Sequence, residues 1–428
     1  MKIAVIGAGW AGCAAAVEAI RLSHHVTLFE ASRTLGGRAR RVDVMHGGKL
    51  LALDNGQHIL IGAYAETLKL MADVGINIPG NLLRLPLTLR FPDGSGLALP
   101  NLPAPFDALA GIFAARGWSW LDKFSLLKVA IDWQLTSFQC DAQQSVSSLC
   151  KGLTPGVMAS LIEPLCVSAL NTPAERASGQ VFLRVMQDSM FSNKGGSNLL
   201  LPLVDLSTLM PNAAAAWLQS HSGEIKLGVR VQSIQLIQNR WHLDTQTPHV
   251  LEQSNAFDSV VIACPPAEAA RLLQSSGQPC DAWLAQTRAL QHEAITTVYV
   301  DAPGACLAQP MLALRASDAH PAQFVFDRGQ LGGPPELLAF VISASEGDSA
   351  TLSQRVAAQA ADQLGLKDLQ VLQTIVEKRA TFACTPGLQR PGMQLARGLL
   401  ACGDYVEGPY PATLEGAVRS GLAAARSL

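Results

Sequence analysis

The sequence predicts an α/β fold, in which a parallel-sheet domain is assembled from separated pieces of the chain and a second, mixed α+β domain occupies the intervals. Three short apolar runs, each ending at glycine or proline, predict buried strands of that sheet: Lys2–Ile6, Phe257–Pro266 and Leu399–Asp404. Their wide separation makes the sheet domain discontinuous in sequence. The hydrophobic content of 49% over 428 residues allows a large core and excludes intrinsic disorder.

The first strand begins a complete strand, turn, helix and strand unit. A glycine-rich turn follows Lys2–Ile6, a helix is predicted from Trp10 to Leu22, and a second strand, His25–Phe29, ends at Glu30. A carboxylate at the end of the second strand can accept hydrogen bonds from ribose hydroxyls. This order is the context in which a glycine fingerprint indicates a Rossmann-like dinucleotide site.

The turn itself has the pattern G-x-G-x-x-G at Gly7, Gly9 and Gly12. Gly7 permits the tight turn, Gly9 lets the backbone approach a pyrophosphate, and Gly12 allows the helix to pack closely on the strand. The first residues of the helix, Trp10 and Ala11, present backbone N–H groups to phosphate. We therefore predict that the diphosphate of a dinucleotide binds at this helix N-terminus.

The next residues, Glu-Ala-Ser-Arg-Thr-Leu-Gly-Gly-Arg at 30–38, resemble the extension after the second strand in FAD enzymes of the flavin amine oxidase and phytoene desaturase superfamily. Gly36 and Gly37 free the backbone to fold over the diphosphate. Arg38 can neutralise phosphate charge with its fork of donors. The resemblance implies FAD as the cofactor, and the acid at Glu30 disfavours a 2′-phosphate.

Two later segments would complete the cofactor site by the same resemblance. Glu224–Gln235 alternates like a strand, and the resemblance implies that Val231 meets the adenine through its backbone atoms. Near the C-terminus, Gly403 interrupts a strand, and the carboxylate of Asp404 suits the ribityl and ribose hydroxyls.

A helix is predicted from about Ala412 onward, directly after that acid. Its N-terminus lies near Thr413 and Leu414, where the positive end of the helix dipole suits partial negative charge at flavin N1 and O2.

These segments divide the chain into two predicted domains. The FAD-binding domain comprises residues 1–85, 222–275 and 372–428, and the substrate domain comprises 86–221 and 276–371. The first substrate segment reads as mostly helical. The second contains strand-like stretches that fit an antiparallel sheet above the flavin, at Ala294–Val300, Gln323–Phe326 and Leu337–Ser343.

A polar turn is the strongest candidate for the reactive part of the site. In the superfamily that the chain resembles, the glycine matching Gly56 lies beside flavin N5, and Asp54, Asn55, Gln57 and His58 surround it in sequence. Gly56 would admit the flavin ring, with Gln57 next to it. His58 is a candidate proton donor because histidine titrates near neutral pH.

Three stretches resemble those of the squalene-associated FAD-dependent desaturases: LDNGQHILIGAY at 53–64, EPLCVSALNTPAERASG at 163–179 and ACGDYVEGPYPATLEGAVRSG at 401–421. Members of that family act as hydroxysqualene dehydroxylases in bacterial hopanoid synthesis. The resemblance implies that reduced FAD delivers hydride to an allylic carbon of hydroxysqualene, with loss of water, to give squalene. The implied partner is a long-chain isoprenoid, and the electron donor for the flavin is left open.

Cleavage of an allylic C–O bond needs a proton for the leaving oxygen. Besides His58, the acids Glu163 and Asp188 are candidates because both are flanked by apolar sequence. An apolar pocket would raise their pKa values and make them better donors near neutral pH. A surface position or a structural salt bridge is the alternative for both.

Other functions remain open at this point. A carotenoid-type desaturase acting on phytoene or dehydrosqualene would use the same fold with the flavin run oxidatively. A non-catalytic, flavin-stabilised lipid carrier would bind without turnover. An amine oxidase would want an aromatic cage beside N5, which four tyrosines in the whole chain disfavour.

Composition limits the partners and the compartment. The net charge of -2 argues against nucleic acid, whose binding needs a basic surface. Nine cysteines without a C-x-x-C pair indicate neither disulfides nor a metal site, which favours a reducing cytoplasm.

One segment is a candidate for membrane contact. Trp118, Trp120, Phe124, Leu127 and Ile131 follow helical spacing, and basic residues accompany them, namely Arg116, Lys123 and Lys128. Such a helix can lie peripherally on the inner face of the cytoplasmic membrane, or it can pack against its own domain. The sequence leaves both arrangements open.

Overall fold

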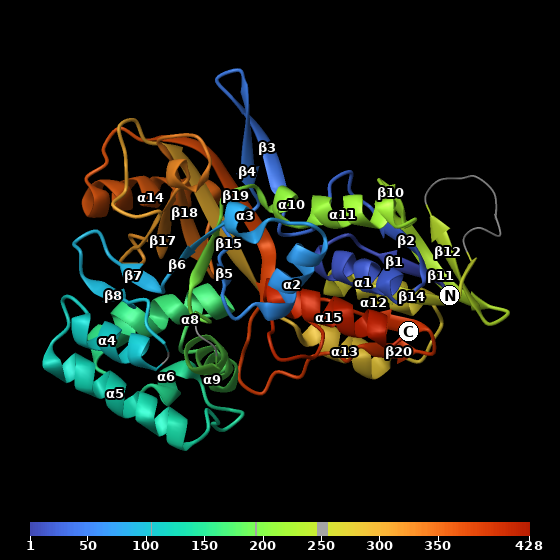
Figure 1. Ribbon diagram of the computed structural model, residues 1–428, viewed down its shortest axis with the longest axis horizontal. Coiled ribbons are helices and arrows are strands. Elements are labelled where there is room, and N and C mark those ends of the chain that lie inside the picture. The colour runs from blue at the N-terminus through green and yellow to red at the C-terminus, as the bar shows by residue number, and fades with distance from the viewer. Residues whose placement is uncertain (104, 193–194, 246–255) are drawn as a thin grey trace.

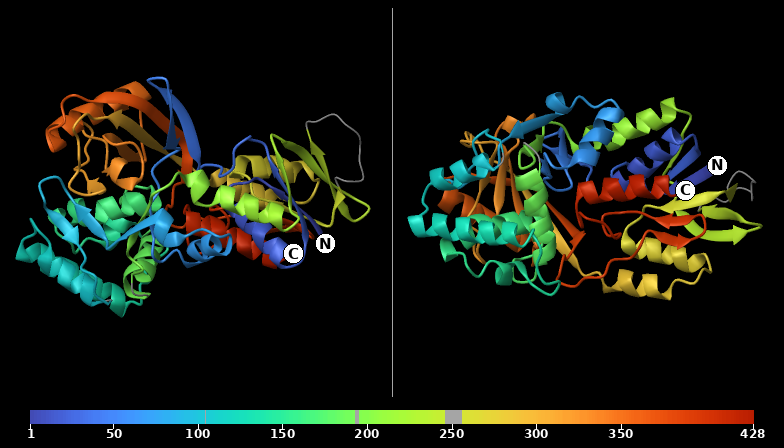
Figure 2. Two further views of the ribbon diagram at one scale, coloured as in Figure 1. Left: turned by 45° about the horizontal axis from the view of Figure 1, so that its top comes forward. Right: turned by 60° about the horizontal axis from the view of Figure 1, so that its bottom comes forward.

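The computed structural model describes residues 1–103, 105–192, 195–245 and 256–428. Both chain termini lie at one end of the long axis of the molecule, with the parallel sheet, while an antiparallel sheet and a group of helices occupy the other end (Figures 1 and 2). The predicted α/β fold class is confirmed.

The parallel sheet has the strand order β10, β2, β1, β14, β21, β20. Its parallel members are β10 (Glu224–Leu227), β2 (His25–Glu30), β1 (Lys2–Ile6), β14 (Ser259–Ile262) and β21 (Leu399–Ala401), and β20 (Gln394–Ala396) adds an antiparallel edge. Apolar runs far apart in sequence therefore pair side by side, as their composition predicts for strands buried on both faces.

Helix α1 (Trp10–Arg21), which follows the glycine turn, packs against two other helices, α11 (Pro211–Ser220) and α15 (Leu414–Arg426). The approach of α1 to α15 depends on Gly421, because a Cβ there would lie 2.1 Å from the carbonyl oxygen of Ala11. The C-terminal helix is thus held against the first helix of the dinucleotide unit.

The segment Glu224–Gln235, expected as one strand, is two strands in two sheets. The chain turns at Gly228, whose φ of +70° is a conformation that favours glycine. Beyond the turn, β11 (Val231–Ile237) pairs with β12 (Arg240–Thr245), and β12 pairs with β13 (Ala256–Phe257). The next helices are α12 (Pro266–Ser275), which packs against β11, and α13 (Asp281–Ala289).

The predicted antiparallel sheet is present and has the order β16, β17, β18, β15, β19. The strands are β16 (Met311–Ala313), β17 (Phe324–Asp327), β18 (Leu337–Ser343), β15 (His292–Asp301) and β19 (Gln370–Phe382), with α14 (Ser349–Leu364) packed beside β15 and β19. Because β19 pairs with β15 along its length, this sheet continues past residue 371, where the FAD-binding segment was expected to resume.

The first interval is mostly helical, as expected. Its helices are α4 (Phe106–Ala114), α5 (Trp120–Leu135), α6 (Val146–Leu149), α7 (Pro155–Val157), α8 (Glu163–Leu170) and α9 (Gly179–Met186), with π-helical turns η1 (Met158–Ile162) and η2 (Gln187–Ser192). Within the described ranges, no helix combines the length and the apolar character needed to cross a bilayer.

The end of this interval lies on the dinucleotide side. Strand β9 (Leu199–Pro202) pairs with β5 (Leu60–Ile61) and β6 (Leu82–Leu85). Helix α10 (Leu206–Leu209) leads into α11, which packs on α1. The remaining elements are the hairpins β3 (Arg41–His46) with β4 (Lys49–Asp54) and β7 (Thr88–Arg90) with β8 (Gly96–Ala98), the helices α2 (Ala65–Asp73) and α3 (Ile78–Asn81), and the 3₁₀ turn η4 (Gly329–Leu331).

Candidate cofactor and active site

The glycine turn between β1 and α1 tolerates no side chains at two positions. A Cβ at Gly7, where φ is +107°, would lie 2.6 Å from the Ala263 carbonyl oxygen, and one at Gly12 would lie 1.8 Å from the carbonyl oxygen of Gly7. Gly9 precedes α1 as its N-cap. The turn therefore requires glycine for steric reasons, and it brings the backbone close to whatever binds there.

The first turn of α1 is suited to an anion. It carries no acidic side chain, and its first N–H groups, those of Trp10 and Ala11, have no partner within the helix. The Trp10 indole is buried and donates to the carbonyl oxygen of Ala39 at 3.1 Å. The Trp10 indole is thus engaged by the protein, and the predicted phosphate contact of Trp10 concerns its backbone alone.

The loop after β2 lies directly over this turn. Gly36 donates its N–H to the carbonyl oxygen of Ala8 at 2.9 Å, and a Cβ at Gly37 would lie 3.3 Å from the Cα of Gly9. The Glu30 carboxylate accepts hydrogen bonds from the N–H groups of Ala8 and Ser32, at 2.7 and 2.8 Å. Glu30, Gly36 and Gly37 are therefore in contact with the glycine turn that would hold a diphosphate.

Arg38 and Asp404 are joined to each other. The guanidinium of Arg38 contacts the Asp404 carboxylate at 2.5 Å and donates to the carbonyl oxygen of Ala380 at 2.6 Å. Arg38 neutralises a carboxylate that is only 7% exposed, and its expected role toward phosphate stays a prediction. The pairing has a physical reason, since a buried carboxylate is stable only when it is paired and hydrogen-bonded.

Two other expected cofactor positions, Gly403 and Val231, make hydrogen bonds within the protein. Gly403 has a φ of +154° and donates its N–H to Ser420 Oγ at 3.1 Å, and a Cβ on it would collide with the ring of Tyr405. Val231 begins β11, and its carbonyl oxygen accepts a hydrogen bond from Arg271 at 2.9 Å. The Val231 backbone is thus already engaged in part by the protein.

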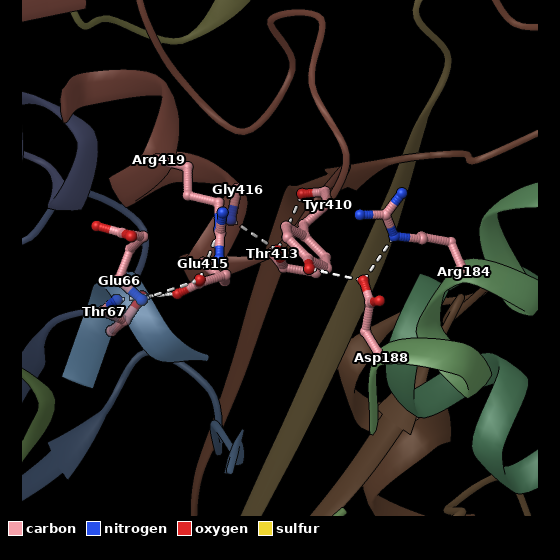
Figure 3. A network of polar contacts seen from close by, with 9 residues as sticks. All are labelled: Glu66, Thr67, Arg184, Asp188, Tyr410, Thr413, Glu415, Gly416 and Arg419. Carbon is pink, nitrogen blue, oxygen red and sulfur yellow. Dashed lines mark hydrogen bonds and ion pairs between the residues drawn. The ribbon is translucent and has the colours of Figure 1, made fainter. Parts of the chain in front are cut away.

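Helix α15 begins where the sequence predicted, and Thr413 caps it. Thr413 accepts a hydrogen bond from the N–H of Gly416 at 2.9 Å, and Leu414 is the first residue of the helix. The next residue, Glu415, is fully buried, and its carboxylate accepts from Thr67 Oγ1 at 2.7 Å and from Arg419 Nε at 2.7 Å (Figure 3). This pairing fixes the helix end against α2 and offsets the carboxylate charge.

The polar turn expected beside flavin N5 adopts the conformation that glycine permits. Gly56 has a φ of +119°, and the Nδ1 of His58 lies 3.0 Å from the Gly56 carbonyl oxygen. Burial, opposed by this hydrogen bond and aided by the charge of Arg38, lowers the pKa of His58. A neutral His58 that donates from Nδ1 leaves Nε2 as an acceptor. Burial therefore shifts protonation of His58 to a more acidic pH than that of a free histidine, and its role as a proton donor stays a prediction.

Asp54 holds this turn to two other elements. Its Oδ1 accepts from the N–H of Leu206 at 2.8 Å, and its carbonyl oxygen accepts from the Tyr299 hydroxyl at 2.9 Å. Both side chains are buried, and burial raises the pKa of the Asp54 carboxyl to about 6. Tyr299 was not identified from the sequence, because its position inside an apolar strand gives no sign that its hydroxyl reaches the turn.

Three buried polar atoms lack a hydrogen-bond partner among the described residues and belong to the segments expected around the flavin: Gln57 Oε1, Thr297 Oγ1 and Tyr405 Oη. A Cβ on Gly56 would be 4.0 Å from Thr297 Oγ1, so β15 reaches the polar turn. Buried polar groups in proteins are normally satisfied. An isoalloxazine beside Gly56, with donors and acceptors at its edges, would supply partners for Gln57 and Thr297.

Residues on β15 and β19 complete the polar surroundings of Arg38. Asn55 Nδ2 donates to Glu377 Oε2 at 2.9 Å and to the carbonyl oxygen of Arg38 at 3.1 Å. Burial and the positive charge of Arg38 lower the pKa of His292. Sequence reasoning missed Glu377 and His292, because only the packing of the antiparallel sheet brings them to the cofactor side.

The two rival acids occupy different environments. Glu163, at the start of α8, is exposed, and partial shielding of its carboxyl together with the charge of Glu175 raises its pKa. Asp188 in η2 contacts Arg184 Nε at 2.6 Å and accepts a hydrogen bond from Tyr410 at 2.6 Å (Figure 3). A surface position for Glu163 and a salt bridge for Asp188 are the alternatives that the sequence left open.

Comparison with known proteins agrees with this geometry. Hydroxysqualene dehydroxylases are among the relatives: that of Rhodopseudomonas palustris is 27% identical over 98% of this chain and 96% of its own, and that of Zymomonas mobilis is 24% identical over 98% and 97%. A solved oxidoreductase from Methanosarcina mazei shares the fold, with a TM-score of 0.75, 17% identity and complete coverage of both chains.

The sequence profile described as flavin containing amine oxidoreductase matches residues 10–428, nearly the whole chain. The glycine turn, the loop over it and the capped C-terminal helix are the parts that such a protein needs to bind FAD. The protein is therefore an FAD-dependent oxidoreductase, and the chain belongs to the flavin containing amine oxidoreductase family.

Proposed function

We propose that this chain is a hydroxysqualene dehydroxylase, which reduces hydroxysqualene to squalene in squalene and hopanoid biosynthesis. The observation that carries the proposal is the match to relatives of that name over almost the full length of both chains. A shared FAD domain alone would produce a match confined to the nucleotide-binding segments. Here the alignment also includes the helical interval and the antiparallel sheet, which would bind the substrate.

The cofactor would be held by the glycine turn, Glu30, Asp404 and the N-terminus of α15. Reduced FAD would supply two electrons in the form of one hydride. The allylic C–O bond would break as a C–H bond forms at the same carbon, and the hydroxyl would leave as water after taking one proton. The chain must therefore place the leaving oxygen within reach of a proton and exclude bulk water.

We propose His58 as the residue that handles this proton. Gly56 fixes the orientation of the imidazole through Nδ1, which leaves Nε2 to hold the leaving oxygen or a water. Because burial lowers the pKa of His58, its protonated form would be a stronger acid than an ordinary imidazolium. Glu163 and Asp188 are weaker candidates, since one is exposed and the other is engaged by Arg184 and Tyr410.

A long isoprenoid substrate resides in lipid, so we also propose that the protein works peripherally at the cytoplasmic face of a membrane. All nine cysteines are free thiols, which fits a reducing compartment.

The test is a single turnover. The purified protein with its FAD photoreduced would be mixed anaerobically with hydroxysqualene, and products would be identified by mass spectrometry. Squalene formed in step with flavin reoxidation is the expected result. Reduction of the oxidised flavin by phytoene or dehydrosqualene, with no reaction of hydroxysqualene, would favour the oxidative desaturase. Binding without any change in the flavin would favour a lipid carrier.

A further inference from the structure

Helix α5 has two apolar faces, and only one of them contacts the protein. Leu126, Val129 and Trp133 are buried against the core. On another side of the helix a second apolar stripe at spacings of three, seven and four residues is 54% to 79% exposed, consisting of Leu121, Phe124, Ile131 and Leu135. A helix that packs on one domain needs a single apolar stripe, so the second stripe needs a separate explanation.

Helix α4 continues this exposed surface. Phe106, Leu109 and Phe113 form a stripe at spacings of three and four residues, and all three are exposed. The rings of Phe113 and Trp120 lie 6.4 Å apart, and those of Trp120 and Phe124 lie 6.0 Å apart. We call the continuous surface the α4–α5 apolar face: Phe106, Leu109, Phe113, Trp120, Leu121, Phe124, Ile131 and Leu135.

The charges around the α4–α5 apolar face are mainly basic. Arg116 and Lys128 are exposed, and Lys123 donates to the carbonyl oxygen of Phe113 at 2.8 Å while its ammonium lies over the Trp120 ring. Two acids lie on helix α5. Asp122 is held in the capping box of Ser119 and by the Thr154 hydroxyl, whereas Asp132 is exposed next to Ile131, so the three basic residues outnumber the one exposed acid. Aromatic side chains mixed with basic ones are typical of segments that lie at a bilayer surface.

The face differs from the helix expected from the sequence. Trp118 precedes α5, is half-buried and donates from its indole to Ser160 Oγ at 2.9 Å, and Leu127 packs against the core. Leu121 and Leu135 take their place on the exposed side. Helices α4 and α5 lie at the end of the long axis opposite both termini and the parallel sheet (Figures 1 and 2).

We infer that the α4–α5 apolar face inserts into the headgroup region of a bilayer containing anionic lipid. The reason for membrane contact rests on the proposed function, since an isoprenoid substrate must be taken from lipid. Self-association is less suited to this surface, because a two-fold contact would place two patches of the same net positive charge against each other. With the face in the bilayer, the opposite end of the molecule, with the parallel sheet, stays in water.

The test is flotation of the FAD-loaded protein with vesicles of phosphatidylcholine, with and without phosphatidylglycerol. Wild-type protein should float with the anionic vesicles, and the variant Leu121→Glu/Phe124→Glu should bind them about 100-fold more weakly. The matched control is Leu236→Glu/Ile237→Glu, because these residues of β11 are also exposed but lie at the other end of the molecule. The control should float like wild type.

A second variant tests the charge. Arg116→Glu/Lys128→Glu should lose most of the preference for anionic vesicles, by about fivefold per residue, with no change in the melting temperature. Failure of the wild type to float, equal loss in the Leu236→Glu/Ile237→Glu control, or a wild-type dimer that the Leu121→Glu/Phe124→Glu variant dissociates would each overturn the inference.

The single turnover with detergent-dispersed hydroxysqualene separates this inference from the proposed function. Variants of the face should keep the wild-type rate in detergent and lose it only when the substrate is supplied in vesicles. Loss of flotation with retained detergent turnover therefore concerns the surface alone, whereas flotation without turnover would overturn the proposed hydroxysqualene reaction and not the surface.

Discussion

Tyr410 donates a hydrogen bond to Asp188 at 2.6 Å, joining the loop before α15 to the π-helical turn η2 (Figure 3). The guanidinium groups of Arg184 and Arg419 lie over the Tyr410 ring, at 5.8 and 4.9 Å from its centroid. The loop that follows Asp404 is thus joined to the helical region through the contacts of Tyr410 with Asp188 and Arg184. Asp188 helps to hold this loop in place, and its expected role as a proton donor stays a prediction.

Asp188→Asn should weaken FAD retention and lower the free energy of unfolding by about 1–3 kcal/mol. The neutral amide cannot form an ion pair with Arg184, and it is a weaker acceptor for the Tyr410 hydroxyl. Thermal unfolding and FAD dissociation would measure this, with Tyr410→Phe as the partner variant. A single-turnover rate within about threefold of wild type is expected. A loss of about 10²-fold with normal FAD retention would instead identify Asp188 as the proton donor.

The single-turnover rate should rise as the pH falls below the ordinary range of histidine. Burial lowers the pKa of His58, so the imidazolium that donates the proton is populated only at more acidic pH. His58→Ala should be slower by about 10²-fold and should lose this dependence. A rate that stays flat with pH in the wild type, or an unaffected variant, would remove His58 from the mechanism.

Gly12→Ala should abolish FAD binding. The added Cβ would lie 1.8 Å from the Gly7 carbonyl oxygen, and relieving that overlap must shift either α1 or the turn. Flavin absorbance per folded protein measures the effect. Gly392→Ala is the control, because nothing lies within 4 Å of a Cβ at that position. A yellow Gly12→Ala protein with full FAD content would contradict the assigned diphosphate site.

Asp54 should make the folded protein less stable as the pH rises. Its pKa is raised from 3.8 to about 6, so the folded state binds the proton more tightly than the unfolded state. The free energy of unfolding should therefore fall by about 2–3 kcal/mol between pH 4 and pH 6 and then level off.

Asp54→Asn removes the titrating group while keeping an oxygen for the Leu206 N–H. The variant should lose this part of the pH dependence and be the more stable protein at pH 7.5. Urea unfolding of the FAD-loaded protein at pH 5 and pH 7.5 measures both. An unchanged slope in Asp54→Asn would show that another group is responsible.

Local sequence was sufficient to predict the dinucleotide unit. The strand from Lys2, the turn at Gly7 and the helix from Trp10 are each specified by residues close in sequence, through apolar runs and backbone conformations that only glycine adopts. For the same reason the start of α15 at Leu414 was predicted within two residues, since its cap is the neighbouring Thr413.

Tertiary structure decided what the charged side chains do. Arg38 pairs with a carboxylate 366 positions away, and Tyr410 reaches Asp188 across 222 positions. The pKa of His58 depends on how deeply its turn is buried, which the turn does not encode. Backbone geometry is set by neighbours along the chain, whereas charge pairing and burial are set by neighbours in space. The sequence by itself therefore determined the cofactor fold, and only the packed molecule decided which ionisable groups are free to act.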